Sequence, residues 1–281
     1  MLFRSPLVAD IHFDHRLAIQ SVENGIAKVR INPGNIGGEA NVRKVADCLK
    51  RHRVPVRIGV NSGSIEKDIL QKYGGVTPEG MVESGLNHAR MLERAGFEDI
   101  VMSFKATDIY KMIGACRLAA KQTGYPQHIG VTESGTADVG VVKSAIGIGA
   151  LLVDGIGDTI RVSLSGDPVQ EVPAGLSILR ACGLRKDGIE IISCPTGGRT
   201  GIDVEGIARV CAETADIRGP LQVAVMGCVV NGPGEAREAD LGVAGGGNGK
   251  GVLFVKDQAP KPVSGDLAAL LIAEVRRMAG A

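Results

Sequence analysis

The sequence has few aromatic residues and no excess of charge of either sign. Aromatic side chains make up 3% of its 281 residues, Trp is absent, and the net charge at pH 7 is +1. Hydrophobic residues reach 44%, so the core must be filled by aliphatic side chains. A nearly neutral chain has no general attraction to nucleic acid or to an anionic membrane, so any anion-binding site must be local.

Long apolar runs and closely spaced cysteines are also missing. No run reaches the roughly 20 residues that a membrane-spanning helix needs. The chain is too long for a small disulfide-stapled fold, and its six Cys are scattered. Residues 1–5 lead directly into a strand pattern without the apolar segment of a secretory leader, so we expect a cytoplasmic protein. The cysteines are Cys48, Cys116, Cys182, Cys194, Cys211 and Cys228.

From Pro6 to about Ser165, short apolar runs that end in polar residues alternate with segments of helical periodicity. One helix is predicted from Thr77 to Gly96, because a capping Thr precedes Pro78 and the apolar residues after it recur at helical spacing. Alternating strands and helices predict parallel strands joined by crossover helices. The six expected strands are Leu7–Asp10, Val29–Asn32, Arg57–Asn61, Ile100–Lys105, His128–Glu133 and Thr159–Ser163.

All six expected strands end in polar residues. A (β/α)8 barrel carries its catalytic side chains at the carboxyl ends of its strands, whereas an open doubly wound sheet concentrates them at one switch point. The even distribution favours an α/β fold of the barrel type. Because only six units are visible, we expect a (β/α)8 TIM-type barrel that lacks its first two βα units, with unpaired edges at the strands around Leu7 and Ile160.

A link at Leu184–Asp187 is predicted to separate the barrel from a smaller α/β domain. The barrel part should end with a helix from about Pro168 to Cys182, capped by Asp167. The predicted domains are therefore residues 1–183 and 188–281. In the second we expect strands at Ile189–Ile192, Leu221–Val225 and Val252–Val255, helices at Val204–Ala215 and Leu267–Met278, a loop over Gly242–Gly251, and a break at Pro260–Pro262.

Four basic residues stand on the expected strands of the barrel: Arg30, Arg57, Lys105 and Arg161. Side chains two or four residues apart on a strand share a face, and the same-face polar partners are Asn32, Asn61, Ser103 and Ser163. Buried positive charge needs a counter-charge, and guanidinium groups match phosphate oxygens two at a time. These four basic residues would form a ring inside the barrel, which favours a phosphorylated ligand. The alternative is pairing with carboxylates inside the barrel, for which Asp10 and Glu133 are available.

Two cysteines lie in turns rich in Gly and Pro, each after an apolar run. Cys194 follows Ile191 and Ile192, and Cys228 follows Val223–Val225. Such turns leave backbone N–H groups free to point at an anionic sulfur, which suits iron–sulfur ligation. Spacing alone leaves an equal alternative of two buried structural Cys, because two Cys are too few for a cluster held entirely by cysteine.

The residues around these two cysteines resemble one family closely. Cys194-Pro195-Thr196, Gly198-Arg199-Thr200 and the run Gly227–Ala236 are similar to the bacterial 4-hydroxy-3-methylbut-2-enyl diphosphate synthases of the non-mevalonate isoprenoid route. The resemblance covers nearly the whole chain and begins within the family's third barrel strand, so a truncated N-terminus is expected. It implies a small iron–sulfur domain after the barrel, with a [4Fe–4S] cluster held by three Cys and one Glu.

The resemblance also implies roles for single residues. The cluster ligands would be Cys194, Cys228 and Glu235; the family's further Cys falls at Gly197, so we expect at best a labile or three-iron cluster. Glu133 would be a proton donor, Glu235 would also act in catalysis by leaving its iron when substrate binds, and Asn231 would contact the substrate or hold the turn before Glu235. Asp10 and His12 match the family's Ala-Asp-Ile-His-Phe-Asp run, with His12 in a secondary role. The implied substrate-binding residues are Arg30, Arg57, Asn61, Lys105, Arg161 and Ser163.

The activity implied by the resemblance is the reductive ring opening of 2-C-methyl-D-erythritol 2,4-cyclodiphosphate to 4-hydroxy-3-methylbut-2-enyl diphosphate. Two electrons would enter through the cluster from ferredoxin or flavodoxin, and a hydroxyl would leave as water. A homodimer is implied, because in the family the cluster of one subunit caps the barrel of its partner. Two alternatives remain open: a phosphate-ester-binding barrel enzyme with structural Cys, and an inactive truncated fragment.

Overall fold

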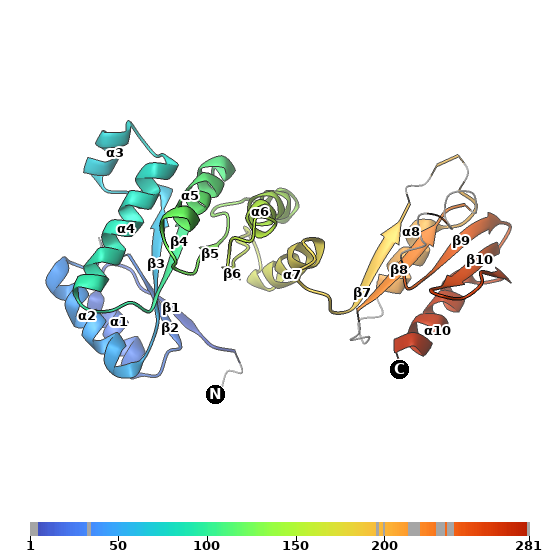
Figure 1. Ribbon diagram of the computed structural model, residues 1–281, viewed down its shortest axis with the longest axis horizontal. Helices are drawn as coiled ribbons and strands as arrows, with labels where there is room; N and C mark the ends of the chain where they lie inside the picture. The colour runs from blue at the N-terminus through green and yellow to red at the C-terminus, as the bar shows by residue number, and fades with distance from the viewer. Residues whose placement is uncertain are drawn as a thin grey trace. The chain divides into compact units, whose positions relative to one another are not determined.

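The computed structural model describes residues 5–32, 35–194, 197–198, 200–212, 220–228, 234 and 239–279, with backbone only for 210–212. The chain forms two compact units, Met1–Leu184 and Arg185–Ala281 (Figure 1). Both units contain helices and parallel strand pairs, so both are of the α/β class.

The first unit is built on parallel strands. Four of them form a sheet in the order β1-β2-β3-β4, and β5 pairs in parallel with β6. A parallel bridge between Met102 and Gln127 continues the sheet from β4 towards β5. The predicted α/β class with parallel strands is thus confirmed. The strands are β1 (Val8–Asp10), β2 (Lys28–Ile31), β3 (Val56–Asn61), β4 (Ile100–Lys105), β5 (His128–Ile129) and β6 (Thr159–Ile160).

Helices follow these strands in the alternation that the sequence predicts. The helix expected after Thr77 is α4 (Pro78–Arg94), and the Thr77 side chain accepts a hydrogen bond from the Gly80 N–H at its start. Asp167 likewise caps a short 3-10 turn, Pro168–Gln170, that leads into α7 (Glu171–Ala181). The others are α1 (His15–Glu23), α2 (Glu39–His52), α3 (Lys67–Tyr73), α5 (Ile109–Gln122) and α6 (Ala137–Leu152), with a 3-10 turn at Ser62–Ser64.

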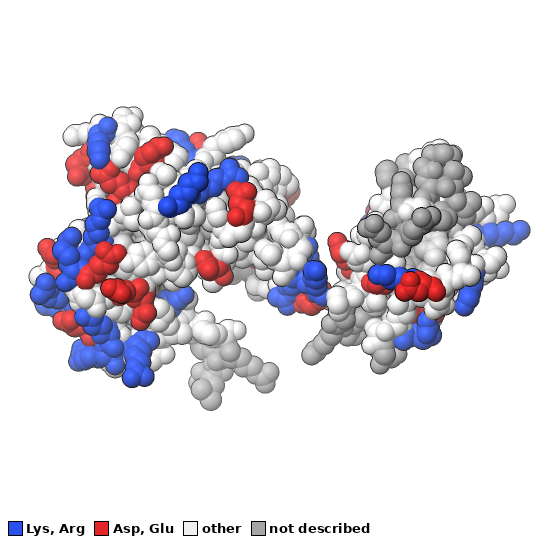
Figure 2. Space-filling view, in the orientation of Figure 1, with Lys and Arg blue, Asp and Glu red and all other residues white. Residues whose placement is uncertain are grey.

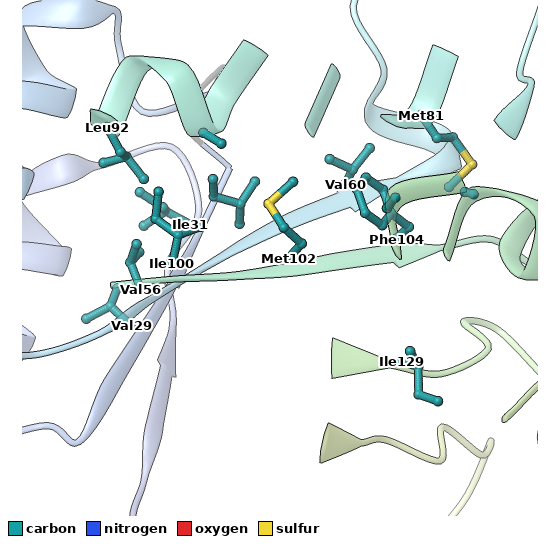
Figure 3. Packing of buried hydrophobic residues seen from close by; sticks show 14 of the residues in the cluster. Val29, Ile31, Val56, Val60, Met81, Leu92, Ile100, Met102, Phe104 and Ile129 are labelled. Atoms are coloured by element: carbon teal, nitrogen blue, oxygen red, sulfur yellow. The ribbon is translucent and has the colours of Figure 1, made fainter. Parts of the chain in front are cut away.

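The core of the first unit is aliphatic, as the composition predicts. Figure 3 shows side chains of β3 and β4 on the side of the sheet from which α4 approaches with Met81 and Leu92. Gly85 of α4 permits this close approach, because an added Cβ would lie 2.6 Å from the Phe104 ring and 2.9 Å from the Met102 side chain. The sheet face packed against α4 is therefore apolar, which leaves the polar strand residues on the other face.

Two strands are shorter than expected. The expected strands His128–Glu133 and Thr159–Ser163 continue only to Ile129 and Ile160. At Glu133 the backbone has φ 52°, a left-handed conformation that no strand contains. The residues beyond these short strands therefore belong to loops.

The second unit contains a five-stranded sheet in the order β11-β10-β9-β8-β7. The strands β7 to β9 pair in parallel, and β9 to β11 pair antiparallel. The core lies between this sheet and the two helices, with Val223, Val225 and Leu271 fully enclosed. The elements are β7 (Ile189–Ser193), α8 (Val204–Ala212), β8 (Leu221–Met226), β9 (Leu241–Gly247), β10 (Lys250–Val255), β11 (Lys261–Ser264) and α10 (Leu267–Ala279).

Two expectations for this unit are wrong. The segment Gly242–Gly251, predicted as a loop, forms most of β9 and the start of β10. Gly242 is needed in the strand, because an added Cβ would lie 2.6 Å from the Ala224 carbonyl oxygen and 2.7 Å from the Phe254 ring. The break expected at Pro260–Pro262 also contains a strand, β11, where Pro262 is tolerated at the edge of the sheet.

Charged residues of both signs are interspersed over the face displayed in Figure 2. This distribution agrees with the near-zero net charge. In the described part of the chain, no helix is both long enough and apolar enough to cross a membrane.

Candidate functional site

The four basic residues of the predicted ring gather in the interior of the first unit, on the face opposite α4. Arg30 of β2 pairs in register with Arg57 of β3, Lys105 ends β4, and Arg161 follows β6. Burial lowers the pKa of Arg57, with Asp10 opposing the shift and the charges of Arg30 and Arg161 adding to it. Because these charges act on one another, the strands bring them into one electrostatic site.

Asp10 neutralises one member of this group. The Arg30 Nη1 donates to Asp10 Oδ1 over 2.9 Å, and the Arg30 side chain is almost fully buried. Gly59 of β3 makes room for the guanidinium, because an added Cβ there would lie 2.7 Å from Arg30 Nη2. The alternative of carboxylate pairing is therefore correct for Arg30.

The other three basic residues have no such partner. Within the described residues, no carboxylate forms an ion pair with Arg57, Lys105 or Arg161. Lys105 is 4% exposed, and its one hydrogen bond to a described residue runs from Nζ to the His128 carbonyl oxygen at 3.4 Å. Burial holds the pKa of Lys105 well below its usual value, and the charges of Arg161 and Arg57 lower it further.

An unsatisfied buried donor lies in the same place. The Nε atom of Arg161 is buried and has no hydrogen-bond partner within the described chain. Unpaired buried donors are rare in folded proteins because each costs about 1–3 kcal/mol. Arg161 therefore lacks an acceptor at Nε beside two further basic residues, Arg57 and Lys105, that have no ion-paired carboxylate, and an anion would supply both.

A cavity of about 330 Å³ opens at the carboxyl ends of these strands. The cavity is lined by Arg30, Asn61, Glu133, His12 and the Ser62–Ser64 turn, among others. A cavity of this size suits a small ligand. Three of the predicted site residues thus share one cavity with His12, whereas Arg57, Lys105, Arg161 and Ser163 are absent from its lining.

The remaining polar residues of the predicted site are held by local contacts. Asn61 begins the Ser62–Ser64 turn, where its backbone N–H and carbonyl both bind Ser64 Oγ. Ser163 accepts a hydrogen bond from Ser134 Oγ through its backbone carbonyl oxygen. Both side chains are half-buried, so they can contact a ligand without a change of backbone.

Two residues of the cavity have strained backbones. Glu133 has φ 52° and Phe13 has φ 62°, values that favour glycine. Such strain collects at functional sites, where the surrounding structure holds it. The Glu133 carboxylate is exposed and accepts a hydrogen bond from Thr107 Oγ1 at 3.0 Å, which fixes it at the edge of the cavity.

In the second unit, Cys194 and Cys228 follow neighbouring parallel strands. Cys194 comes directly after β7 and Cys228 two residues after β8, with Ser193 and Val225 paired in register. The Cys194 Sγ accepts a hydrogen bond from the Gly227 N–H at 3.0 Å, so one turn donates to the sulfur of the other. Both cysteines are half-buried.

The rest of the predicted cluster site is only partly described. Glu235 and Asn231 lie outside the described residues. At Gly197 the N–H donates to Thr200 Oγ1 over 2.8 Å, and an added Cβ would meet no described atom within 4 Å. No group of three or more His, Cys, Asp or Glu side chains is close enough to hold a metal ion in the part of the chain that the structure describes.

Two family models match the chain in order. The GcpE TIM-barrel domain matches residues 2–176, and the GcpE protein C-terminal domain matches residues 190–277. The chain belongs to the GcpE family. This membership confirms the resemblance carried by the residues around Cys194 and Cys228, and the first unit is the family's TIM-barrel domain.

Curated GcpE relatives are similar over most of this chain. Those from Caldanaerobacter subterraneus subsp. tengcongensis and Clostridium perfringens are 58% identical over 97% of this chain and 55% over 92%. The relative from Geobacter sulfurreducens is 54% identical over 97%. The chain covers 77%, 74% and 78% of their lengths, respectively. All three are named 4-hydroxy-3-methylbut-2-en-1-yl diphosphate synthase (flavodoxin), so GcpE is a family of enzymes.

Sequence reasoning missed two residues of the GcpE barrel interior. Gly59 carries no chemical signal, and only its contact with Arg30 reveals why the position must be small. His128 was assigned to a strand without a role, yet it is buried among the basic residues. The sequence contains one signal, because His128 begins the expected strand that ends in Glu133.

Proposed function

We propose that this chain catalyses the reductive ring opening of 2-C-methyl-D-erythritol 2,4-cyclodiphosphate to 4-hydroxy-3-methylbut-2-enyl diphosphate. The observation that carries the proposal is the buried positive charge of Lys105 and Arg161, neither of which forms an ion pair with a carboxylate among the described residues, although Asp10 and Glu171 act on Arg161 from a greater distance. A cyclic diphosphate supplies several anionic oxygens within one small molecule. The names of the relatives support the same product.

The substrate's phosphates would bind to the basic interior. Arg57 and Arg161 are half-buried and reachable, and their forked N–H groups match two phosphate oxygens each. Lys105 would add a point charge. Its hydrogen bond to the His128 carbonyl oxygen is long, at 3.4 Å, so its Nζ can turn to a phosphate oxygen. Arg30 would contribute less, because Asp10 already neutralises it. Asn61 and Ser163 would donate neutral hydrogen bonds beside them.

Glu133 is the proposed proton donor. Its carboxylate stands at the edge of the cavity and is held by Thr107. Opening the ring consumes two electrons and two protons and releases one water, with one C–O bond broken at the ring and one at the departing hydroxyl. A carboxyl group at the cavity edge can deliver a proton to an oxygen that leaves.

The cysteine turns fit an iron–sulfur cluster in their donor chemistry. The Cys194 sulfur accepts a hydrogen bond from the Gly227 N–H, and hydrogen bonds to sulfur are among the contacts that tune iron–sulfur clusters. Cys194, Cys228 and Glu235 are the proposed ligands of a [4Fe–4S] cluster, which when bound would supply the two electrons one at a time. Gly197 offers no donor atom, so this chain as written is proposed to hold at best a labile or three-iron cluster.

The remaining parts of the proposal concern domains and partners. We assign the substrate site to residues 1–183 and the cluster to residues 188–281. The electron donor is proposed to be flavodoxin, as the relatives' names indicate, with ferredoxin as the alternative. A homodimer is proposed because the family resemblance implies one, and the proposed location is the cytoplasm.

The test uses the Gly197→Cys variant, reconstituted anaerobically with iron and sulfide and supplied with reduced flavodoxin. It should convert the cyclodiphosphate to the hydroxymethylbutenyl diphosphate, detected by mass spectrometry. Adding Glu133→Gln should leave binding intact and slow turnover by about 10²–10⁴-fold, the usual contribution of a positioned acid. An iron-loaded variant that binds the cyclodiphosphate and never forms product contradicts the proposed reaction, and one that does not bind it contradicts the proposed substrate.

A further inference from the structure

His128 is a buried histidine that the proposed mechanism leaves without a task. It is 6% exposed and lies in β5, next to Thr159 of β6. Its neighbour Ile129 packs in the apolar core, so alternation along the strand directs His128 to the opposite, basic face. The His128 carbonyl oxygen accepts hydrogen bonds from Ser103 Oγ at 2.9 Å and from Lys105 Nζ at 3.4 Å. The residue therefore lies directly beside the proposed anion site.

One nitrogen of the imidazole is satisfied and the other is not. Nδ1 lies 2.8 Å from Thr159 Oγ1, a normal hydrogen bond. Nε2 is buried and has no partner within the described residues. An unpaired buried nitrogen is costly, so its position calls for a partner that the described residues do not supply.

Four positive charges act on His128. Lys105, Arg57, Arg161 and Lys28 act on it from β4, β3, the β6 loop and β2. Burial and then these four charges lower the pKa of His128 to about 2, so the imidazole is neutral at physiological pH. A neutral imidazole carries its single proton on one of the two nitrogens.

The surroundings indicate which nitrogen carries the proton. If Nε2 were an acceptor, any of the cationic donors nearby could satisfy it, and Lys105 already reaches the carbonyl oxygen of the same residue. None of them does. An Nε2–H group accounts for this, because ammonium and guanidinium groups offer it no acceptor. The Thr159 hydroxyl then donates to Nδ1 and fixes this tautomer.

Two donors without acceptors thus lie in one interior, His128 Nε2 and Arg161 Nε. We propose that His128 is a further ligand of the bound phosphates, with its Nε2–H donating to a phosphate oxygen at the inner end of the site. The inference rests on the proposed function, because it takes the anion to be the substrate's diphosphate. A neutral donor at this depth binds an anion without adding to the repulsion among Lys105, Arg57 and Arg161.

Calorimetric titration of inorganic pyrophosphate into the full chain tests the inference. His128→Leu removes the donor and should weaken binding by about ten- to a hundredfold, the range of a hydrogen bond to a charged group. His128→Gln retains an N–H near the same place and should recover most of the affinity. The matched control is His88→Gln. His88 is also buried and also has one nitrogen, Nδ1, without a partner among the described residues, but its Nε2 pairs with Glu66 Oε1 at 2.6 Å and it belongs to α4, which packs on the apolar face of the sheet. It should leave the pyrophosphate affinity unchanged.

A spectroscopic readout keeps the test decisive if His128→Leu fails to fold. In protein labelled with ¹⁵N-histidine, the His128 Nε2 resonance is identified by its loss in His128→Gln. It should be that of a protonated nitrogen and should shift when pyrophosphate is added. If it does not shift, or if His128→Leu binds as tightly as the unaltered chain, the inference is wrong. If Arg57→Ala and Lys105→Ala also leave the affinity unchanged, the proposed substrate site itself is wrong.

Discussion

Arg30 Nη1 lies 2.9 Å from Asp10 Oδ1, and no other member of the basic interior has an ion-paired carboxylate among the described residues. Asp10 therefore stabilises the ligand-free site and competes with an anion for Arg30. The interior as a whole keeps an excess of positive charge. This arrangement suits a site that must fold empty and then bind a multiply charged ligand.

The first prediction concerns this pair. Asp10→Asn should lower the free energy of unfolding by about 1–3 kcal/mol, because the buried guanidinium loses its charged partner. Added pyrophosphate should restore more stability to this variant than to the unaltered chain. Chemical denaturation with and without pyrophosphate measures both effects. The control is Asp154→Asn, which breaks the exposed pair with Arg117 and should cost less than about 1 kcal/mol. Equal losses in the two variants would contradict the role of Asp10.

Gly59→Ala should disturb the site without removing any polar group. A methyl group at residue 59 collides with the Arg30 guanidinium and must displace it from Asp10. We expect a lower free energy of unfolding, measured by chemical denaturation, and an altered pyrophosphate affinity, measured by calorimetry. Gly124→Ala is the matched control, because an added Cβ there meets no described atom within 4 Å. If the Gly59 and Gly124 variants behave alike, Arg30 does not depend on this packing.

The stability of the chain should fall as the solution becomes acidic, and His128 should be one cause. Its pKa is about 2 in the folded chain, where burial and the charges of Lys105, Arg57, Arg161 and Lys28 oppose protonation, and about 6.5 in the unfolded chain. Below about pH 6.5 the unfolded state binds a proton that the folded state does not, so unfolding becomes easier. Denaturation between pH 7 and pH 5 should show a shallower dependence in His128→Gln. An identical dependence in both forms would contradict this assignment.

The sequence predicts the fold best where local chemistry and tertiary packing agree. Thr77 and Pro78 mark the start of α4 by capping alone, and the structure confirms it. The glycines of β9 predict a loop, because glycine is unfavourable in strands. The structure nevertheless requires glycine at residue 242, where a side chain would collide with Ala224 and Phe254. Such contacts join residues far apart in the chain, and no local pattern contains them.

For the candidate site, the sequence likewise predicts some features and not others. The positions of Arg30, Arg57, Lys105 and Arg161 follow from strand ends, because parallel strands bring their carboxyl ends together. The partners of these residues do not follow from the sequence. Asp10 pairs with Arg30, whereas Glu133 accepts a hydrogen bond from Thr107 and has a left-handed backbone that the strand pattern does not predict.

Gly197→Cys should create a cluster ligand. An added Cβ at residue 197 meets no described atom within 4 Å, and the hydrogen bond from the Gly197 N–H to Thr200 Oγ1 can persist. After anaerobic reconstitution, the variant should contain four irons and the unaltered chain fewer, by iron and sulfide analysis and electron paramagnetic resonance. Gly198→Cys is the matched control, since that position is equally open and should not complete the cluster. A four-iron cluster in the unaltered chain would contradict the need for a ligand at residue 197.

The binding of the cyclodiphosphate to the basic interior is the central claim, and titration calorimetry tests it most directly. The unaltered chain should bind 2-C-methyl-D-erythritol 2,4-cyclodiphosphate, and Arg57→Ala or Arg161→Ala should each weaken binding by about 1.5–3 kcal/mol. Arg117→Ala, which removes an exposed guanidinium of the same unit, should leave binding unchanged. Affinity that is unchanged in both Arg57→Ala and Arg161→Ala would contradict the account.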